Sequence, residues 1–79
     1  MMELKRMSEM KVGERGAIYA VEDTGNLNRH FSRLGLTCGT EVQCVGIAPF
    51  GDPMSYRVGE TVFAFRHCDT EKIRVEVHL

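Results

Sequence analysis

The sequence predicts a mainly β fold, in which about five short strands form a small barrel and one short helix follows the first strand. Two features lead to this prediction. Short apolar stretches are separated by Gly, Pro and Asp about every ten residues, which is typical of small all-β barrels and sandwiches. The chain has 79 residues, and this length indicates that residues 1–79 form a single domain.

The first expected strand covers residues 17–21, where small, β-branched and aromatic side chains follow one another. Met7 and Met10 come shortly before Gly13, and we expect a short turn there in which the two methionines cap the core. Asp and Asn residues after the strand supply turn chemistry before the helix begins.

One helix is expected, starting from an N-cap at Asn26 or Asn28 and running to about Leu34. Leu27, Phe31 and Leu34 are spaced at i, i+4 and i+7, and they therefore share one face. An apolar face of this kind plugs a barrel more often than it binds a partner.

The end of this helix carries further signals. Gly35 is expected to stop the helix in the left-handed conformation, and Leu36 then folds back against it. Arg29 and Arg33 lie four residues apart on the side that faces solvent, where they are available to acidic groups of a partner.

Residues 41–47 form the second expected strand, which buries Val42 and Cys44 on one face. The next six residues, 48–53, contain two Pro, one Gly and one Asp, so they cannot continue a central strand. We interpret them as a stiff loop that presents Phe50, either to a partner or into the mouth of the barrel.

Residues 54–58 and 61–66 are expected to form a hairpin, joined by Gly59 and Glu60 in a type II′ turn. In this register three facing pairs share one mostly apolar face: Val58 with Thr61, Tyr56 with Phe63, and Met54 with Phe65. Polar side chains, including two arginines, lie on the opposite face, as in a half-buried antiparallel sheet.

The chain is expected to close with a helical turn at residues 69–72 and a strand in which Ile73, Val75 and Val77 alternate with polar residues. An exposed edge on this last strand would allow pairing with a second copy, so a homo-oligomer is an open expectation. Five short strands with one helix after the first indicate an SH3-like barrel.

The charge balance excludes several classes of partner. Ten Lys and Arg against eleven Asp and Glu give a net charge of −1, which argues against nucleic-acid binding and against a polybasic membrane anchor. No apolar run approaches the roughly 20 residues that cross a bilayer, and the start of the chain lacks a signal-peptide pattern. We therefore expect a cytoplasmic protein without membrane insertion.

The sequence offers no motif for metal binding, cofactor binding or catalysis. Three cysteines form no disulfide framework, and the spacings of common zinc sites are absent. The chain also lacks a phosphate-binding glycine loop and any nucleophile with an orienting base. We expect no catalytic residue, no cofactor and no physiological metal, although a surface His or Cys is compatible with an adventitious transition metal.

Several stretches resemble one known family. The sequence FSRLGLTCGTEV at residues 31–42 resembles an element of the FeoA family, ferrous iron transport protein A, in which a helix ends in Leu-Gly-Leu or Leu-Gly-Phe before a Gly-Thr strand start. Residues 48–54, APFGDPM, are similar to the family's loop of Pro, Leu or Phe, Gly, Asp, Pro and Ile, and FAFR at residues 63–66 is similar to its Leu-Ala-Leu-Arg element. These matches occur in the family's order along nearly the whole chain.

The resemblance implies a small cytosolic accessory of the ferrous iron transporter FeoB, which binds the transporter's cytosolic part and modulates its assembly or GTPase-linked transport. The residues that we expect to contact the partner lie in the loop, on the helix and on the polar face of the hairpin: Pro49, Phe50, Gly51, Asp52, Pro53, Arg29, Arg33, Arg57 and Arg66.

Two alternatives stay open. FeoA-like barrels also form the C-terminal domains of metal-dependent transcription regulators, so the chain is alternatively a stand-alone regulatory or metal-responsive module. A small barrel that stacks RNA bases on Tyr19 and Tyr56 is a more distant alternative, because the net charge does not favour it.

Overall fold

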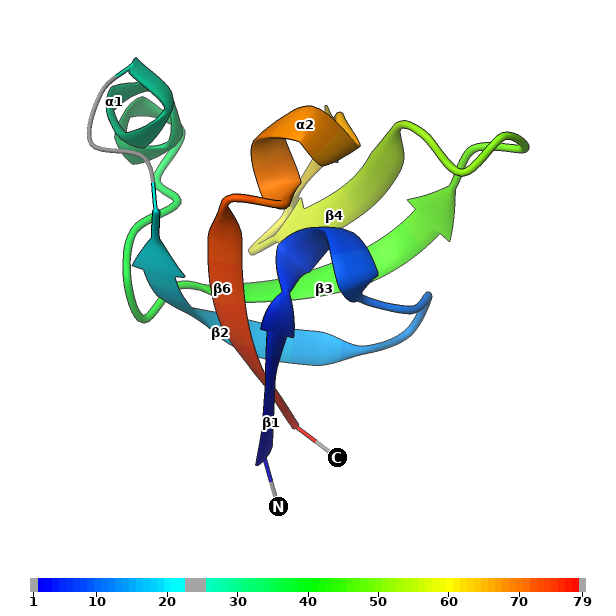
Figure 1. Cartoon of the computed structure of the whole chain (residues 1–79), viewed down its shortest axis with the longest axis horizontal. Coiled ribbons are helices and arrows are strands. Elements are labelled where there is room, and N and C mark those ends of the chain that lie inside the picture. The colour runs from blue at the N-terminus through cyan, green and yellow to red at the C-terminus, as the bar shows by residue number, and fades with distance from the viewer. Residues whose placement is uncertain (1, 23–25, 79) are drawn as a thin grey trace.

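The computed structural model describes residues 2–22 and 26–78, except for the side chain of Leu27 (Figure 1). Its strands are β1 Met2–Arg6, β2 Arg15–Val21, β3 Glu41–Ile47, β4 Met54–Val58, β5 Thr61–Phe65 and β6 Ile73–His78. Its helices are the short 3₁₀ turn η1 Met7–Glu9, α1 Asn26–Arg33 and α2 His67–Thr70. The six strands form one antiparallel sheet in the order β1-β6-β2-β3-β4-β5.

The mainly β class is confirmed, but the expected strand count was one too low. The missing strand is β1, whose Met2 to Arg6 alternate apolar and charged side chains and carry no β-branched residue. This strand exists because it pairs with β6 over five residues, from Met2 opposite His78 to Arg6 opposite Arg74. Strand β2 also begins two residues earlier than expected, at Arg15.

The expectation that the closing strand lies at the edge of the sheet is wrong. β6 lies between β1 and β2, so both of its sides are paired, and the outer strands are β1 and β5. Its Ile73, Val75 and Val77 are fully buried, as their alternation with polar residues predicts. β6 is therefore the central strand of this half of the sheet.

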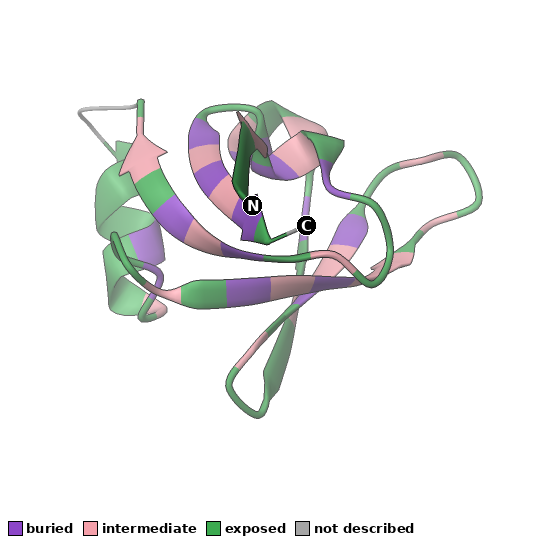
Figure 2. Ribbon diagram, turned by 90° about the horizontal axis from the view of Figure 1, so that it is seen from below, coloured by how far each residue is buried: buried purple, intermediate pink, exposed green. Residues whose placement is uncertain are grey.

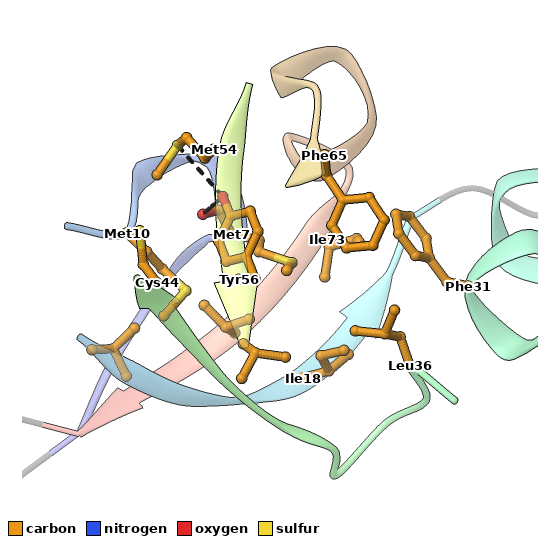
Figure 3. Packing of buried hydrophobic residues seen from close by; sticks show 13 residues of the cluster. Met7, Met10, Ile18, Phe31, Leu36, Cys44, Met54, Tyr56, Phe65 and Ile73 are labelled. Atoms are coloured by element: carbon orange, nitrogen blue, oxygen red, sulfur yellow. Dashed lines mark hydrogen bonds between the residues drawn. The ribbon is translucent and has the colours of Figure 1, made fainter. Parts of the chain in front are cut away.

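The inner face of the curved sheet encloses a single cluster of buried side chains, which Figure 3 shows from close by. Met7 and Met10 close one end of this cluster, as expected from the sequence. The hydroxyl of the fully buried Tyr56 donates a hydrogen bond of 2.9 Å to the Met7 carbonyl oxygen, which fixes η1 against β4. The other end is closed by Phe31 and Leu36 from the α1 segment.

The end of α1 forms as expected. The Gly35 amide donates to the Ser32 carbonyl and the Leu36 amide donates to the Phe31 carbonyl, which are the two hydrogen bonds of a Schellman motif. Gly35 has a φ of +86°, in the left-handed region that glycine adopts without steric cost. Leu36 is buried, whereas the expected role of Leu27 lies outside the described residues.

The β4–β5 hairpin has the expected register, with Val58 opposite Thr61 and Met54 opposite Phe65. Gly59 has a φ of +62° and Glu60 does not have a positive φ, which is the type II′ pattern. Buried and exposed residues alternate along the neighbouring strands β2 and β3 (Figure 2).

The last helical turn lies earlier than expected, at His67–Thr70 rather than at residues 69–72. Its first amide, that of His67, donates a hydrogen bond of 2.9 Å to the Asp52 carboxylate. Because this partner comes from a loop 15 residues away, the local sequence alone did not indicate where the helix begins. None of the described helices is long and apolar enough to cross a membrane.

Candidate partner-binding surface

The β3–β4 loop, residues 48–53, is folded tightly by its own backbone. The Gly51 amide donates to the Ala48 carbonyl at 2.8 Å, and the Ala48 amide donates to the Pro53 carbonyl at 3.1 Å. Gly51 has a φ of +87°, and the Asp52–Pro53 peptide bond is cis. With Pro49 between these contacts, the loop has little conformational freedom to lose on binding.

Asp52 connects this loop to α2, since its Oδ1 accepts the hydrogen bond from the His67 amide. The sequence pattern suggested Asp52 only as a partner contact. The structure gives it a bracing role inside the molecule, at the base of the loop. The loop is thus held at three points, two within itself and one on the following helix.

Phe50 projects from the tip of the loop with 98% of its surface exposed. The alternative that Phe50 fills the mouth of the barrel is therefore wrong, because the ring is not part of the buried cluster. Ile47, at the end of β3, is also partly exposed at 46%. A fully exposed Phe on a braced loop is unusual, since burial of such a side chain is favourable by about 1.5–3 kcal/mol.

The helical arginines lie far from this loop. Arg29 and Arg33 are exposed on α1, and α1 and the β3–β4 loop occupy opposite ends of the molecule in both views (Figures 1 and 2). The molecule measures about 30 Å along its longest axis. The structure therefore separates the expected contacts into two distinct places.

The two hairpin arginines also separate. Arg66 is exposed at the start of α2, where it precedes His67. Arg57 lies on the outer face of β4 and lines an open depression of about 370 Å³. The other residues lining this depression are Arg15, Glu41, Val42, Gln43 and Gly59.

Arg15 and Gln43 were missed by the sequence reasoning. Gln43 lies directly opposite Arg15 on β2 and directly opposite Arg57 on β4, so the three side chains form one row across three strands. Arg15 lies outside the strand that the sequence predicted, which starts at residue 17. The polar residues of β2 and β3 would have indicated this row had their pairing register been known.

A second depression, of about 240 Å³, lies on the outer face of β1, β6 and β2. Its walls are largely apolar and include the exposed side chains of Leu4 and Tyr19. An ion pair between Arg74 Nε and Glu22 Oε1 borders it. No residue that we expected to contact a partner lines this depression.

The titratable groups of the core are held neutral. Burial raises the pKa of the Cys44 thiol and also raises the pKa of the Tyr56 phenol. At neutral pH both groups therefore keep their protons, and Cys44 is a poor metal ligand. Within residues 2–22 and 26–78, no three side chains of the types His, Cys, Asp and Glu gather where they could hold a metal ion.

Surface carboxylates instead stabilise the start of the chain. The Glu14 carboxylate accepts a 2.7 Å hydrogen bond from the Lys11 amide, which lowers its pKa, and it also pairs with Lys5 at 3.1 Å. Burial opposes the charge on Lys5, but its hydrogen bonds to Glu14 and Glu3 outweigh this effect and raise its pKa. These pairs anchor β1 and the turn before β2, and they do not form a reactive site.

Comparison with known proteins gives a consistent result. The model of the FeoA domain family matches residues 5–77. A Fe(2+) transport protein A/Fe(2+) transporter FeoB fusion protein from Porphyromonas gingivalis is 32% identical over 72 residues, which are 91% of this chain and 8% of that protein. The chain thus spans a small part of this curated relative.

Solved structures share the fold over most of the chain. Iron(II) transport protein A from Clostridium thermocellum has a TM-score of 0.87 at 29% identity, over 92% of this chain and 45% of that one. FeoA from Stenotrophomonas maltophilia, described as an SH3 domain protein complexed with zinc, has a TM-score of 0.78 at 28% identity, over 90% and 88% of the two chains. The expected SH3-like class is confirmed by this likeness.

Proposed function

The chain belongs to the FeoA family, and from this premise we propose that it is a small cytosolic accessory protein of ferrous iron uptake. It binds the cytosolic part of a FeoB-type membrane transporter and modulates the assembly or the GTPase-linked transport of that partner. The whole of residues 1–79 acts as one binding domain. Its activity is recognition of a partner and not catalysis.

The observation that carries this proposal is the exposure of Phe50 on a braced loop. Leaving a Phe in water forgoes about 1.5–3 kcal/mol, which a binding partner recovers when it buries the ring. The loop hydrogen bonds and the Asp52 contact to α2 reduce the entropy lost on binding. A partner pocket for one aromatic ring, flanked by the partly exposed Ile47, fits this arrangement.

The fused relative supports the choice of partner. Its printed name joins a transport protein A segment to the transporter FeoB in one chain. Joining two domains covalently gives each a high effective concentration for the other, which favours pairs that act together. A FeoB-type transporter is therefore the partner that we propose for this chain.

The proposal is tested by recovering the transporter with the tagged full chain from detergent-solubilised native cells. Phe50→Ser should reduce the transporter recovered by about tenfold, because the ring is the anchor of the contact. The matched control is Leu4→Ser, since Leu4 is a large apolar residue that is 60% exposed far from the loop. Recovery should stay unchanged in that control.

Thermal unfolding of both variants separates binding from folding. The midpoint should move by less than about 2 °C for Phe50→Ser, because the side chain makes almost no contact in the free protein. Loss of the fold in this variant, or equal recovery of the transporter by all three proteins, would contradict the proposal.

A further inference from the structure

The depression on the outer face of β2, β3 and β4 has a defined charge pattern. Arg15, Gln43 and Arg57 lie side by side across the three strands, and we call these three residues the arginine row. Arg15 and Arg57 are exposed, while Gln43 lies half-buried between them. Residues directly opposite one another on antiparallel strands point to the same face, so both guanidinium groups border one depression.

Neither arginine forms an ion pair within the described residues. The ion pairs of Lys5 with Glu3 and Glu14, and of Arg74 with Glu22, lie elsewhere, and none within residues 2–22 and 26–78 reaches Arg15 or Arg57. The Gln43 amide nitrogen donates to the Gly13 carbonyl at 3.4 Å, which leaves its side-chain oxygen directed elsewhere. Two unpaired cations therefore flank one amide on the sheet.

The distance between the two arginines limits which ligands can contact both of them. Neighbouring strands lie about 4.8 Å apart, so the backbones of Arg15 and Arg57, two strands apart, are separated by about 10 Å. Two carboxylates three residues apart have about this separation, and lie on one side of the chain, when the segment adopts the polyproline II conformation, which has three residues per turn and rises about 3.1 Å per residue. Each guanidinium can take one carboxylate through two parallel hydrogen bonds.

We propose that the arginine row binds an acidic segment of a partner protein through two carboxylates about 10 Å apart. The inference deepens the proposed function and rests on it, because the partner that carries the segment is the one captured through Phe50. The row contributes two contacts, Arg15 and Gln43, that were not among the residues expected from the sequence.

The Glu41 carboxylate makes the binding of a phosphate-rich ligand unfavourable. It lines the same depression, two residues along β3 from Gln43 and on the same face. A polyphosphate or a nucleic-acid backbone would meet this carboxylate in a protein whose net charge is −1. A peptide tolerates it, because a segment with two acidic residues can present a basic or amide group to Glu41.

The first test uses a capped hexapeptide with two glutamates three residues apart, titrated into the ¹⁵N-labelled full chain at low salt. We expect chemical-shift changes centred on Arg15, Gln43 and Arg57. The peptide with glutamines in place of the glutamates should produce less than about a tenth of these changes, because charge-assisted contacts are lost. Inorganic phosphate serves as a second probe.

Paired variants locate the effect. Arg15→Gln/Arg57→Gln should abolish the shifts, and the conservative Arg15→Lys/Arg57→Lys should keep only part of them, because lysine retains the charge but not the two-pronged contact. The matched control is Arg29→Gln/Arg33→Gln, which removes the same charge from α1 and should leave the shifts intact. All four positions are exposed, so the variants should fold.

The second test measures affinity for the transporter's cytosolic part. The Arg15/Arg57 glutamine variant should bind about tenfold more weakly than the unchanged chain and with less dependence on salt, as expected for a charged contact. If Phe50→Ser loses binding and this variant does not, the inference is overturned while the proposed function stands.

The two tests distinguish failure of the proposed function from failure of the inference about the arginine row. If the unchanged chain does not bind the transporter but the acidic peptide binds the row, the proposed function fails and the row's preference for carboxylates stands for another partner. The inference is overturned if the glutamine peptide or phosphate gives equal shifts at the row, or if the acidic peptide gives none.

Discussion

The two ends of the molecule place the same residue type in opposite environments. At one end, Phe31 of α1 is 1% exposed and its ring meets Phe65 edge to face, with the ring centres 4.9 Å apart. At the other end, Phe50 is 98% exposed on a loop held by polar contacts. At the first end the Phe31 ring completes the core. At the other end the backbone of the loop is fixed without any contribution from the Phe50 ring. Phe31 therefore contributes to stability, whereas Phe50 is left free for the recognition role that we propose.

Among the substitutions that test this comparison, Phe31→Ala is expected to change stability most. Removing a buried aromatic ring should lower the free energy of unfolding by about 3–5 kcal/mol, because it leaves a cavity beside Phe65. Urea unfolding of the full chain measures this loss. Phe50→Ala is the matched control, with an expected change below about 0.5 kcal/mol. Equal losses in the two variants would remove the distinction between the ends.

Gly35→Ala tests how the core end is attached. Alanine at a φ of +86° should cost about 1–2 kcal/mol, because a Cβ is disfavoured in the left-handed region. The same urea experiment reports it, with Ser32→Ala in the exposed face of α1 as the control. Unchanged stability would show that the Schellman motif does not hold α1 against the core.

Asp52→Ala tests how the loop end is attached, and it has the smallest expected effect. Loss of the acceptor for the His67 amide should lower stability by about 1 kcal/mol. Hydrogen exchange at the His67 amide should become faster, and binding through Phe50 should weaken because the loop loses one anchor. Asp52→Asn keeps an acceptor oxygen and should restore most of the protection. An unprotected His67 amide in the unchanged chain would contradict this role.

Features with local causes were predictable from the sequence. The stop of α1 at Gly35, the register around Gly59 and the alternation in β6 each depend on neighbouring residues, and all three are confirmed. Strand β1 was missed because its pairing partner, β6, lies about seventy residues away. The start of α2 was misplaced because Asp52 supplies its first hydrogen-bond acceptor from another loop.

The candidate binding surface likewise has a part that the sequence predicted and a part that it did not. A loop rich in Pro and Gly singled out Phe50 from the sequence, but whether its ring faced solvent or the mouth of the barrel was decided only by the structure. The arginine row needs the register of β2 on β3 and of β3 on β4 together, and the β2–β3 register was not predictable from local patterns. Arg57 was expected from the sequence to contact a partner, but Arg15 and Gln43 beside it were not.

The pairing of Met2 with His78 has a consequence for how such a domain enters larger proteins. Because β1 and β6 are antiparallel partners, the first and last described residues lie at one corner of the molecule (Figure 1). A domain whose ends meet can be spliced into or onto another polypeptide with little distortion of either. The corner is well separated from the tip of the β3–β4 loop in Figure 1. A polypeptide joined at this corner therefore leaves the β3–β4 loop and the exposed Phe50 uncovered.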